Sequence, residues 1–183
     1  MVVSSVAPVA LNESECLSTE VVNLPEQMEC IDGKLIEKTG ITFKHSVTQA
    51  NLTYYWVNYI ISSGQRGKVC TEAPCRTGKQ SRRPDVAYIT PQLLEEIGEF
   101  TILPHSFPLI AEVASPDESA EELFAKAKEY LISGCQEVLL LFPENQVVLI
   151  ITQEKWLVFK AGEQVSTQNV LEGFSVNVDE LFA

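Results

Sequence analysis

The stretch Phe107-Pro108-Leu109-Ile110-Ala111-Glu112-Val113-Ala114 decides the fold. It is apolar almost throughout, and such a run is typical of a strand in a sheet that is covered on both faces. One carboxylate, Glu112, interrupts the run. A buried carboxylate costs free energy unless it is paired with a cation or bound to a metal. The stretch therefore predicts a central strand with one buried carboxylate that needs either a cationic partner or a metal.

The residues that follow this strand predict a helix and then a set of strands. Ser119 can cap a helix with Glu122 three residues later, which is a capping-box pattern. We expect the helix to run to about Ile132 and to stop at Ser133-Gly134. Residues 137–142, 147–152 and 156–160 are typical of three short strands. The sequence thus predicts a strand-helix-strand unit beside an antiparallel meander.

The residues that precede the central strand predict a hairpin and a long helix. Asp32-Gly33 suits a type I′ turn between strands at 28–31 and 34–38. A helix is expected from Phe43 to Ser63-Gly64, because apolar residues recur there with a 3.6-residue period. We expect that periodic face to be buried, and it consists of Phe43, Val47, Ala50, Tyr54, Val57 and Ile61, widened by Leu52, Trp56 and Tyr59. Short strands at 68–72 and 85–90 and a short helix from Pro91 to Ile97 complete the pattern.

The whole chain fits a single α/β domain. Its 183 residues are 45% hydrophobic, which suits one core. We expect a partly disordered N-terminal tail at 1–24 and one domain at 25–183. No apolar run approaches the length that a membrane span needs, so no membrane partner is expected.

The five cysteines form no paired zinc-ligand pattern. They stand at 16, 30, 70, 75 and 135, and an odd count is typical of reduced thiols in a cytoplasm. The chain has only two histidines. Any metal is therefore expected to be a hard cation held by carboxylates.

The chain is acidic as a whole but contains one basic segment. A net charge of −12 argues against general attraction to nucleic acid, because phosphate contacts need a basic surface. Residues 66–83, however, hold six basic side chains against the single acid Glu72, and we call this segment the basic strip. On the residues alone, a solvated loop between two strands is the favoured interpretation of the basic strip.

Three features could perform chemistry. Asp85 follows Pro84 at the start of a strand, Glu112 lies in the buried strand, and Lys126 or Lys128 lies on the next helix. Two carboxylates on neighbouring strands could bind one divalent cation, for which Mg²⁺ is suited. A nearby lysine could orient water or stabilise a charged transition state. Both lysines border the apolar stripe of the helix, so periodicity does not choose between them.

These motifs resemble those of a known family. The succession consists of Asp32-Gly33-Lys34-Leu35-Ile36-Glu37, Arg83-Pro84-Asp85-Val86-Ala87, Ala111-Glu112-Val113-Ala114-Ser115-Pro116 and Lys126-x-x-x-Tyr130-x-x-x-Gly134. Its order and spacing resemble the restriction endonuclease-like proteins of the Uma-two family, abundant in cyanobacteria, over about residues 28–160. That family belongs to the PD-(D/E)XK nuclease superfamily. The resemblance implies a restriction-endonuclease-like core, with a mixed sheet flanked by helices and an N-terminal hairpin.

The resemblance also implies a site. Asp85 and Glu112 are expected as metal ligands, with the carbonyl of Val113 as a third. The superfamily lysine is expected two residues after Glu112, where this chain has Ala114, and the resemblance assigns that role to Lys126 instead. Glu37 matches an acid of the family that supports the site or a second metal.

The expected reaction is endonucleolytic hydrolysis of DNA phosphodiester bonds with Mg²⁺, for which Mn²⁺ can substitute. Two cuts on a duplex suit a homodimer. The basic strip supplies the candidate nucleic-acid contacts, which are Arg76, Lys79, Arg82 and Arg83.

Two other interpretations stay open. In the first, Asp85 caps a turn and Glu112 pairs with Lys126 in a polar notch without metal, so that an inactive nuclease-fold protein serves as a binding or regulatory module. The net charge of −12 favours it. In the second, Asp85 and Glu112 are the carboxylates of a glycosidase. The chain lacks the aromatic sugar platforms that this activity would need. His45, at the start of the first helix, is interpreted as a polar surface or capping residue.

Overall fold

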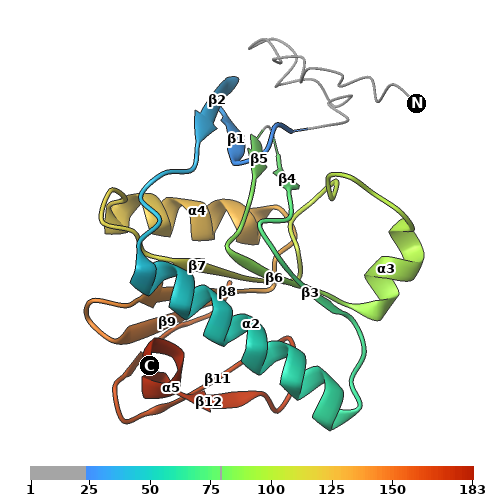
Figure 1. The fold of residues 1–183 in the computed structure, drawn as a ribbon. Helices are drawn as coiled ribbons and strands as arrows, with labels where there is room; N and C mark the ends of the chain where they lie inside the picture. The colour runs from blue at the N-terminus through green and yellow to red at the C-terminus, as the bar shows by residue number, and fades with distance from the viewer. Residues whose placement is uncertain (1–23, 79) are drawn as a thin grey trace, which may run out of the picture.

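A mixed six-stranded sheet forms the centre of the protein (Figure 1). The computed structural model describes residues 24–78 and 80–183. In spatial order the strands of the central sheet are β10 (Trp156–Lys160), β9 (Val147–Ile151), β8 (Glu137–Phe142), β7 (Leu109–Val113), β6 (Val86–Ile89) and β3 (Lys68–Thr71). This architecture confirms the α/β class and places the predicted central strand, β7, inside the sheet.

The parallel pair in this sheet comes from the strand-helix-strand unit. β7 runs parallel to β8, and the other strand pairs of the sheet are antiparallel. Helix α4 (Ala120–Ile132) makes the crossover, and the predicted capping box between Ser119 and Glu122 is present at its start. The predicted meander of β8, β9 and β10 is confirmed.

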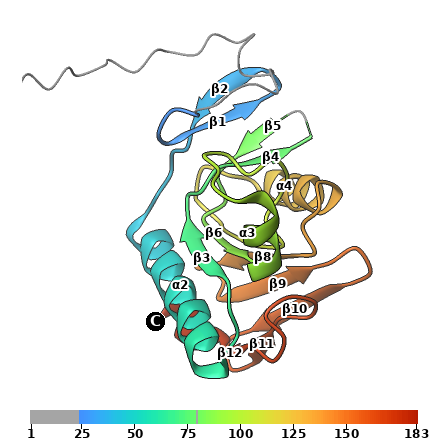
Figure 2. The ribbon, with the colours of Figure 1, turned by 90° about the vertical axis from the view of Figure 1, so that its right-hand side faces the viewer.

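Helices cover both faces of the central sheet (Figure 2). On one face, α2 (Phe43–Ser63) packs together with α5 (Val178–Phe182) and the two-stranded sheet of β11 (Gln164–Ser166) and β12 (Ser175–Asn177). On the other face, α4 and the short helix α3 (Pro91–Ile97) enclose a second core. The full coverage explains why β7 is apolar on both of its faces.

A second, smaller sheet stands over one end of the central one. Its strands follow the order β2 (Lys34–Glu37), β1 (Met28–Ile31), β5 (Gln80–Arg82) and β4 (Cys75–Thr77). The predicted hairpin forms β1 and β2, and positive φ angles at Asp32 and Gly33 fit the type I′ turn. The sequence did not predict β4 and β5, so part of the basic strip is a hairpin and not a loop.

The buried face of α2 differs from the prediction. The helix begins and ends where the sequence indicated, with Thr42 as its N-cap and Gly64 in a left-handed conformation as its C-cap. Its buried residues are His45, Thr48, Leu52 and Trp56, which confirms the predicted burial of Leu52 and Trp56. The periodic run that begins at Phe43, however, is largely turned to solvent: Phe43 is 84% exposed, Tyr54 62% and Ile61 75%. The helix carries apolar residues on two faces, and the longer periodic run is the outer one.

The first described residues and the cysteines can be compared with the sequence-based expectations. Residues 1–23 of the predicted tail lie outside the described residues, and Leu24 is buried beside Cys30. Cys70, Cys75 and Cys135 are free thiols, whereas Cys30 is disulfide-bonded, so the expectation of reduced cysteines is not met throughout. None of the helices in residues 24–78 and 80–183 is long and apolar enough to cross a membrane.

Candidate active site

The two predicted metal ligands lie side by side at one end of the central sheet. β6 and β7 pair antiparallel with Val86 opposite Ala111, and one further step in this register sets Asp85 beside Glu112. Directly opposite residues of an antiparallel pair point to the same face. Both carboxylates are buried, and both line a cavity of about 400 Å³. The sheet thus brings together two acids that are 27 residues apart in the sequence.

Asp85 is in contact with three groups from separate parts of the chain. Its Oδ1 accepts from Lys38 Nζ at 2.8 Å, and its Oδ2 accepts from the main-chain N–H of Val113 at 2.7 Å and lies 3.2 Å from His45 Nε2. Burial disfavours the charged carboxylate, but the positive charge of Lys38 and the contact with His45 outweigh it and hold the pKa of Asp85 well below its usual range. Asp85 is therefore ionised across the physiological pH range.

The carboxylate of Glu112 has fewer close partners than that of Asp85 to offset the cost of its burial. Its Oε1 accepts from the Tyr130 hydroxyl at 2.6 Å, and Lys126 Nζ lies 3.9 Å from its Oε2. Burial raises the pKa of Glu112 to about 8, because Lys126 offsets only part of the cost of burial and the negative charge of Asp85 adds to it. The two acids thus differ in ionisation, which is the kind of perturbation found at functional sites.

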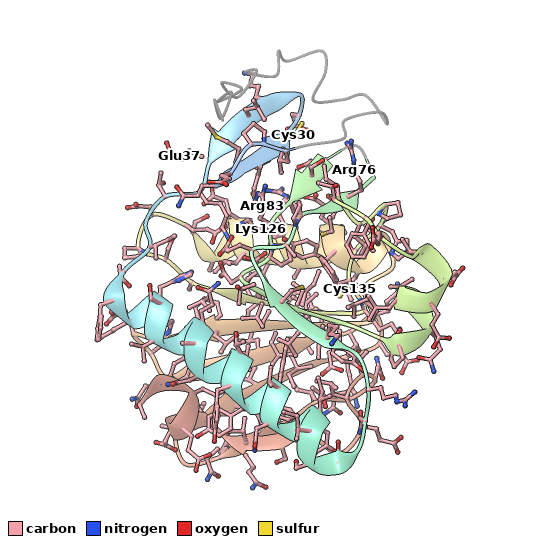
Figure 3. All side chains as sticks on the ribbon, turned by 45° about the vertical axis from the view of Figure 1, so that its right-hand side comes forward. Cys30, Glu37, Arg76, Arg83, Lys126 and Cys135 are labelled. Carbon is pink, nitrogen blue, oxygen red and sulfur yellow. The ribbon has the colours of Figure 1, made fainter. Side chains whose placement is uncertain are left out.

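Lys126 is the lysine of α4 that faces the site. Its Nζ lies 2.6 Å from Glu118 Oε1 and 3.9 Å from Glu112, and its side chain is only 14% exposed. Burial opposes its positive charge, but Glu112 and Glu118 outweigh this effect and raise its pKa above its usual value. Lys128 is exposed. Figure 3 shows Lys126 on α4, beneath the hairpin that carries Glu37.

The remaining predicted residues of the metal site lie at its edge. Glu37 is exposed on β2 and lines the same cavity. The Val113 N–H points to Asp85, and the N–H and C=O of one residue in a strand point to the same side. The carbonyl group of Val113 is thus turned to the side of β7 that faces β6, close to Asp85.

Two arginines of the basic strip, Arg82 and Arg83, form ion pairs and hydrogen bonds within the protein. Arg82 is only 7% exposed and pairs with Glu29 and Glu129 at 3.1 and 2.7 Å. The guanidinium group of Arg83 donates to main-chain carbonyls of four residues, Leu24, Pro25, Met28 and Glu72.

These contacts argue against a direct phosphate contact by Arg82. Arg76 is half-buried on β4, and Lys79 lies outside the described residues. Figure 3 shows Arg76 and Arg83 near the small sheet.

Sequence reasoning missed several residues of the site. Lys38, directly after β2, and Glu72, directly after β3, pair at 2.8 Å beside Asp85. His45 was interpreted as a surface or capping residue, yet it is 3% exposed and contacts Asp85. Tyr130, noted only within a motif, binds Glu112. The 34-residue separation of Lys38 and Glu72 left no local signal for their contact.

The donor set suits a hard divalent cation. In residues 24–78 and 80–183, no group of three or more His, Cys, Asp and Glu side chains could hold a metal ion. Mg²⁺, however, is usually bound through one or two carboxylates, with water and substrate phosphate supplying the other oxygens. Asp85 and Glu112 fit that mode. The cavity itself is acidic, lined by seven carboxylate side chains against three cationic ones: Glu29, Glu37, Asp85, Glu112, Asp117, Glu118 and Glu122 against Lys38, Arg82 and Lys126.

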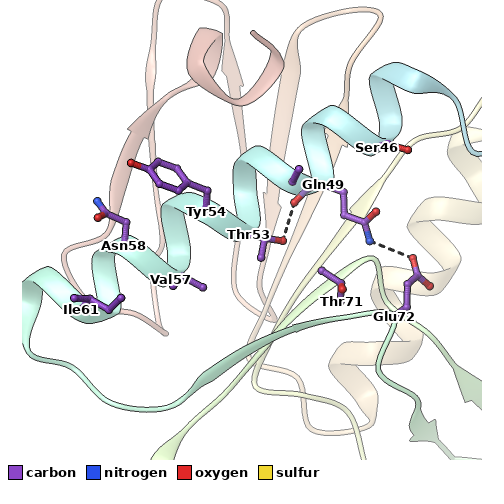
Figure 4. A pocket seen from close by; sticks show the side chains of 10 residues that line it. Ser46, Gln49, Thr53, Tyr54, Val57, Asn58, Ile61, Thr71 and Glu72 are labelled. Atoms are coloured by element: carbon purple, nitrogen blue, oxygen red, sulfur yellow. Dashed lines mark hydrogen bonds between the residues drawn. The ribbon is translucent and has the colours of Figure 1, made fainter.

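A second hollow lies along the outer side of α2. It has a volume of about 630 Å³ and is bordered by Tyr54, Val57 and Ile61 on the helix and by Thr71 and Glu72 beyond it (Figure 4). Apart from Glu72 it has no charged lining residue. Its apolar character contrasts with the acidic cavity at Asp85 and Glu112.

The mixed sheet, its crossover helix and the paired acids define a restriction-endonuclease-like fold. A family model with the description "Putative restriction endonuclease", Uma2, matches residues 13–179, and the chain belongs to this family. A crystal structure of a "putative nuclease belonging to DUF820" from Anabaena variabilis is similar to this chain, with a TM-score of 0.74 and 25% sequence identity. The match covers 85% of this chain and 89% of that one. No curated protein matches the sequence.

Proposed function

We propose that this protein is a divalent-metal-dependent endonuclease that hydrolyses phosphodiester bonds of DNA. One observation carries the proposal: Asp85 and Glu112 line one cavity, and Lys126 lies 3.9 Å from Glu112. Family membership and the nuclease-type neighbour support the same reaction class.

In the proposed site, Asp85, Glu112 and the carbonyl of Val113 would hold Mg²⁺, with Mn²⁺ as a substitute. The cation, when bound, would lower the pKa of a water and neutralise charge on the phosphate. Asp85 is already ionised, whereas Glu112 must give up its proton to act as a ligand. Lys126 keeps its positive charge beside Glu112, where it can orient water or stabilise charge that develops on the phosphate. Glu37 supports the site from its rim.

The proposed partners of the protein are DNA and a second copy of the chain. Arg76 and Lys79 remain proposed DNA contacts from the basic strip. Arg82 and Arg83 are no longer proposed as such, because their guanidinium groups bind groups of the fold. We further propose a homodimer, supported by the exposed apolar side chains on the outer face of α2. A cytoplasmic location and a single domain at 25–183 complete the proposal.

Plasmid nicking tests the proposed activity. Purified protein with Mg²⁺ or Mn²⁺ is expected to convert supercoiled plasmid into open circles, and a chelator is expected to stop the conversion. Asp85→Asn, Glu112→Gln and Lys126→Met should each abolish nicking. Lys128→Met is the matched control, because Lys128 is exposed on the same helix. Undiminished nicking by the Glu112→Gln protein would refute the assignment.

The alternative function is that of an inactive nuclease-fold protein that binds a partner. The net charge of −12 and the acidic cavity favour it, because both repel phosphate in the absence of a cation. Calorimetry separates the two functions. Heat from Mn²⁺ binding that is lost in Asp85→Asn supports the nuclease, whereas no binding at millimolar Mn²⁺ supports the inactive protein.

A further inference from the structure

Lys38 is held by oxygen atoms in the way that a metal cation would be. Its Nζ lies 2.8 Å from each of three oxygens, which belong to the Asp85 carboxylate, the Glu72 carboxylate and the Arg83 carbonyl. An ammonium group has three N–H donors, so this arrangement satisfies all of them. The side chain is only 13% exposed. Lys38 is therefore a fixed positive charge inside the candidate site.

The surrounding chain holds the three oxygens in place. Glu72 adopts a positive φ of 55°, an uncommon conformation for a residue with a side chain. Gln49 donates to Glu72 Oε1 at 3.2 Å and to the Asp85 carbonyl at 2.7 Å. Arg83 Nη1 donates to the Glu72 carbonyl at 2.8 Å. The cage around Lys38 thus has its own supports from α2 and from the segment that precedes β6.

We propose that the Lys38 ammonium group is a built-in cation that competes with a divalent metal for Asp85. Lys38 bonds to Oδ1, while Val113 and His45 contact Oδ2, so three of the roughly four lone-pair positions of the carboxylate are taken. A metal at Asp85 would lie beside a positive charge and would share its ligand oxygen. Lys38 must move away, or the metal binds less tightly. This inference rests on the proposed role of Asp85 as a metal ligand.

A binding measurement on variants tests this competition without any nuclease substrate. Calorimetry with Mn²⁺ would compare the wild type with Lys38→Met, with Lys34→Met as the control, because Lys34 is an exposed lysine of the same hairpin. Removal of a competitor is expected to tighten Mn²⁺ binding about tenfold, within the range of about 5 to 150-fold that is typical of coupled sites. Lys34→Met should leave the affinity unchanged. Equal or weaker binding by Lys38→Met overturns the inference.

The two proposals fail differently in this experiment. If neither the wild type nor Lys38→Met binds Mn²⁺, the metal site itself is wrong. If both bind with the same affinity, the metal site stands and only the competition is wrong.

Amine labelling of the wild type provides a test that does not depend on the folding of a variant. Acetic anhydride modifies exposed lysine amines, and mass spectrometry of peptides locates the modified residues. Lys38 is expected to react slowly without metal and several-fold faster at saturating Mn²⁺, while the exposed Lys128 reacts equally in both conditions. Unchanged or slower modification of Lys38 at saturating Mn²⁺ contradicts the competition.

Discussion

The main-chain N–H of Val113 donates a hydrogen bond to Oδ2 of Asp85 over 2.7 Å, which joins the end of β7 to the residue that precedes β6. The same carboxylate holds Lys38 and contacts His45. Asp85 is therefore a structural centre as well as a candidate metal ligand. Its removal should affect stability in the absence of any metal or substrate.

Asp85→Ala is expected to lower the free energy of unfolding by about 3–5 kcal/mol, because it leaves the largely buried Lys38 without one of its two carboxylate partners. Urea denaturation in metal-free buffer measures this loss. Asp117→Ala is the control, since Asp117 is an exposed acid on the rim of the same cavity, and it should change stability by about 0.5 kcal/mol or less. A loss at Asp85 no larger than that of the control would contradict the structural role.

Stability should depend on pH through Glu112. Its folded pKa of about 8 lies above its ordinary value of 4.5, so the folded state binds more protons than the unfolded state between these values. The free energy of unfolding should therefore fall as pH rises across this window in metal-free buffer. Glu112→Gln should make the pH dependence flatter, and denaturation at several pH values measures the difference. Parallel pH profiles for the wild type and Glu112→Gln would show that the pKa of Glu112 is not raised.

Arg82→Met should act on stability rather than on nucleic-acid binding. The change leaves buried Glu29 and half-buried Glu129 without their cation, at a cost of about 3–5 kcal/mol. Thermal or urea unfolding measures this cost, and Arg66→Met is the control because Arg66 is exposed. Wild-type stability together with weaker DNA binding in Arg82→Met would instead support the phosphate contact expected from the sequence.

The sequence predicted most elements because their signals are local. The capping box of α4, the Asp32-Gly33 turn and the apolar run of β7 each lie within a few residues, and each is present in the structure. β4 and β5 were missed because both are three residues long and mostly polar. The paired acids followed from a buried carboxylate and a family resemblance, and the register of β6 and β7 sets them side by side.

Other features depend on contacts that no local pattern reveals. α2 has apolar side chains on two faces, and only the packed sheet determines that Leu52 and Trp56 are buried while Tyr54 and Ile61 are exposed. Lys38 reaches Asp85 across 47 residues of sequence. Its position in the hairpin is typical of a surface lysine. The tertiary structure alone makes it part of the site.

The exposed apolar face of α2 is the proposed contact of the homodimer. Ile61→Glu places a charge on a side chain that is 75% exposed, and it should lower the dimer fraction without loss of stability. Val158→Glu is the control, because Val158 is 55% exposed on β10, away from α2. Sedimentation velocity at several concentrations measures the fraction. A wild type that stays monomeric at every concentration would contradict the proposed homodimer.

The central claim, a metal site at Asp85 and Glu112, is tested most directly by anomalous diffraction from crystals of the wild-type protein at saturating Mn²⁺. We predict an anomalous peak between the carboxylates of Asp85 and Glu112, close to the carbonyl of Val113. A map with no peak there, or with a peak only at other acids, would contradict the claim.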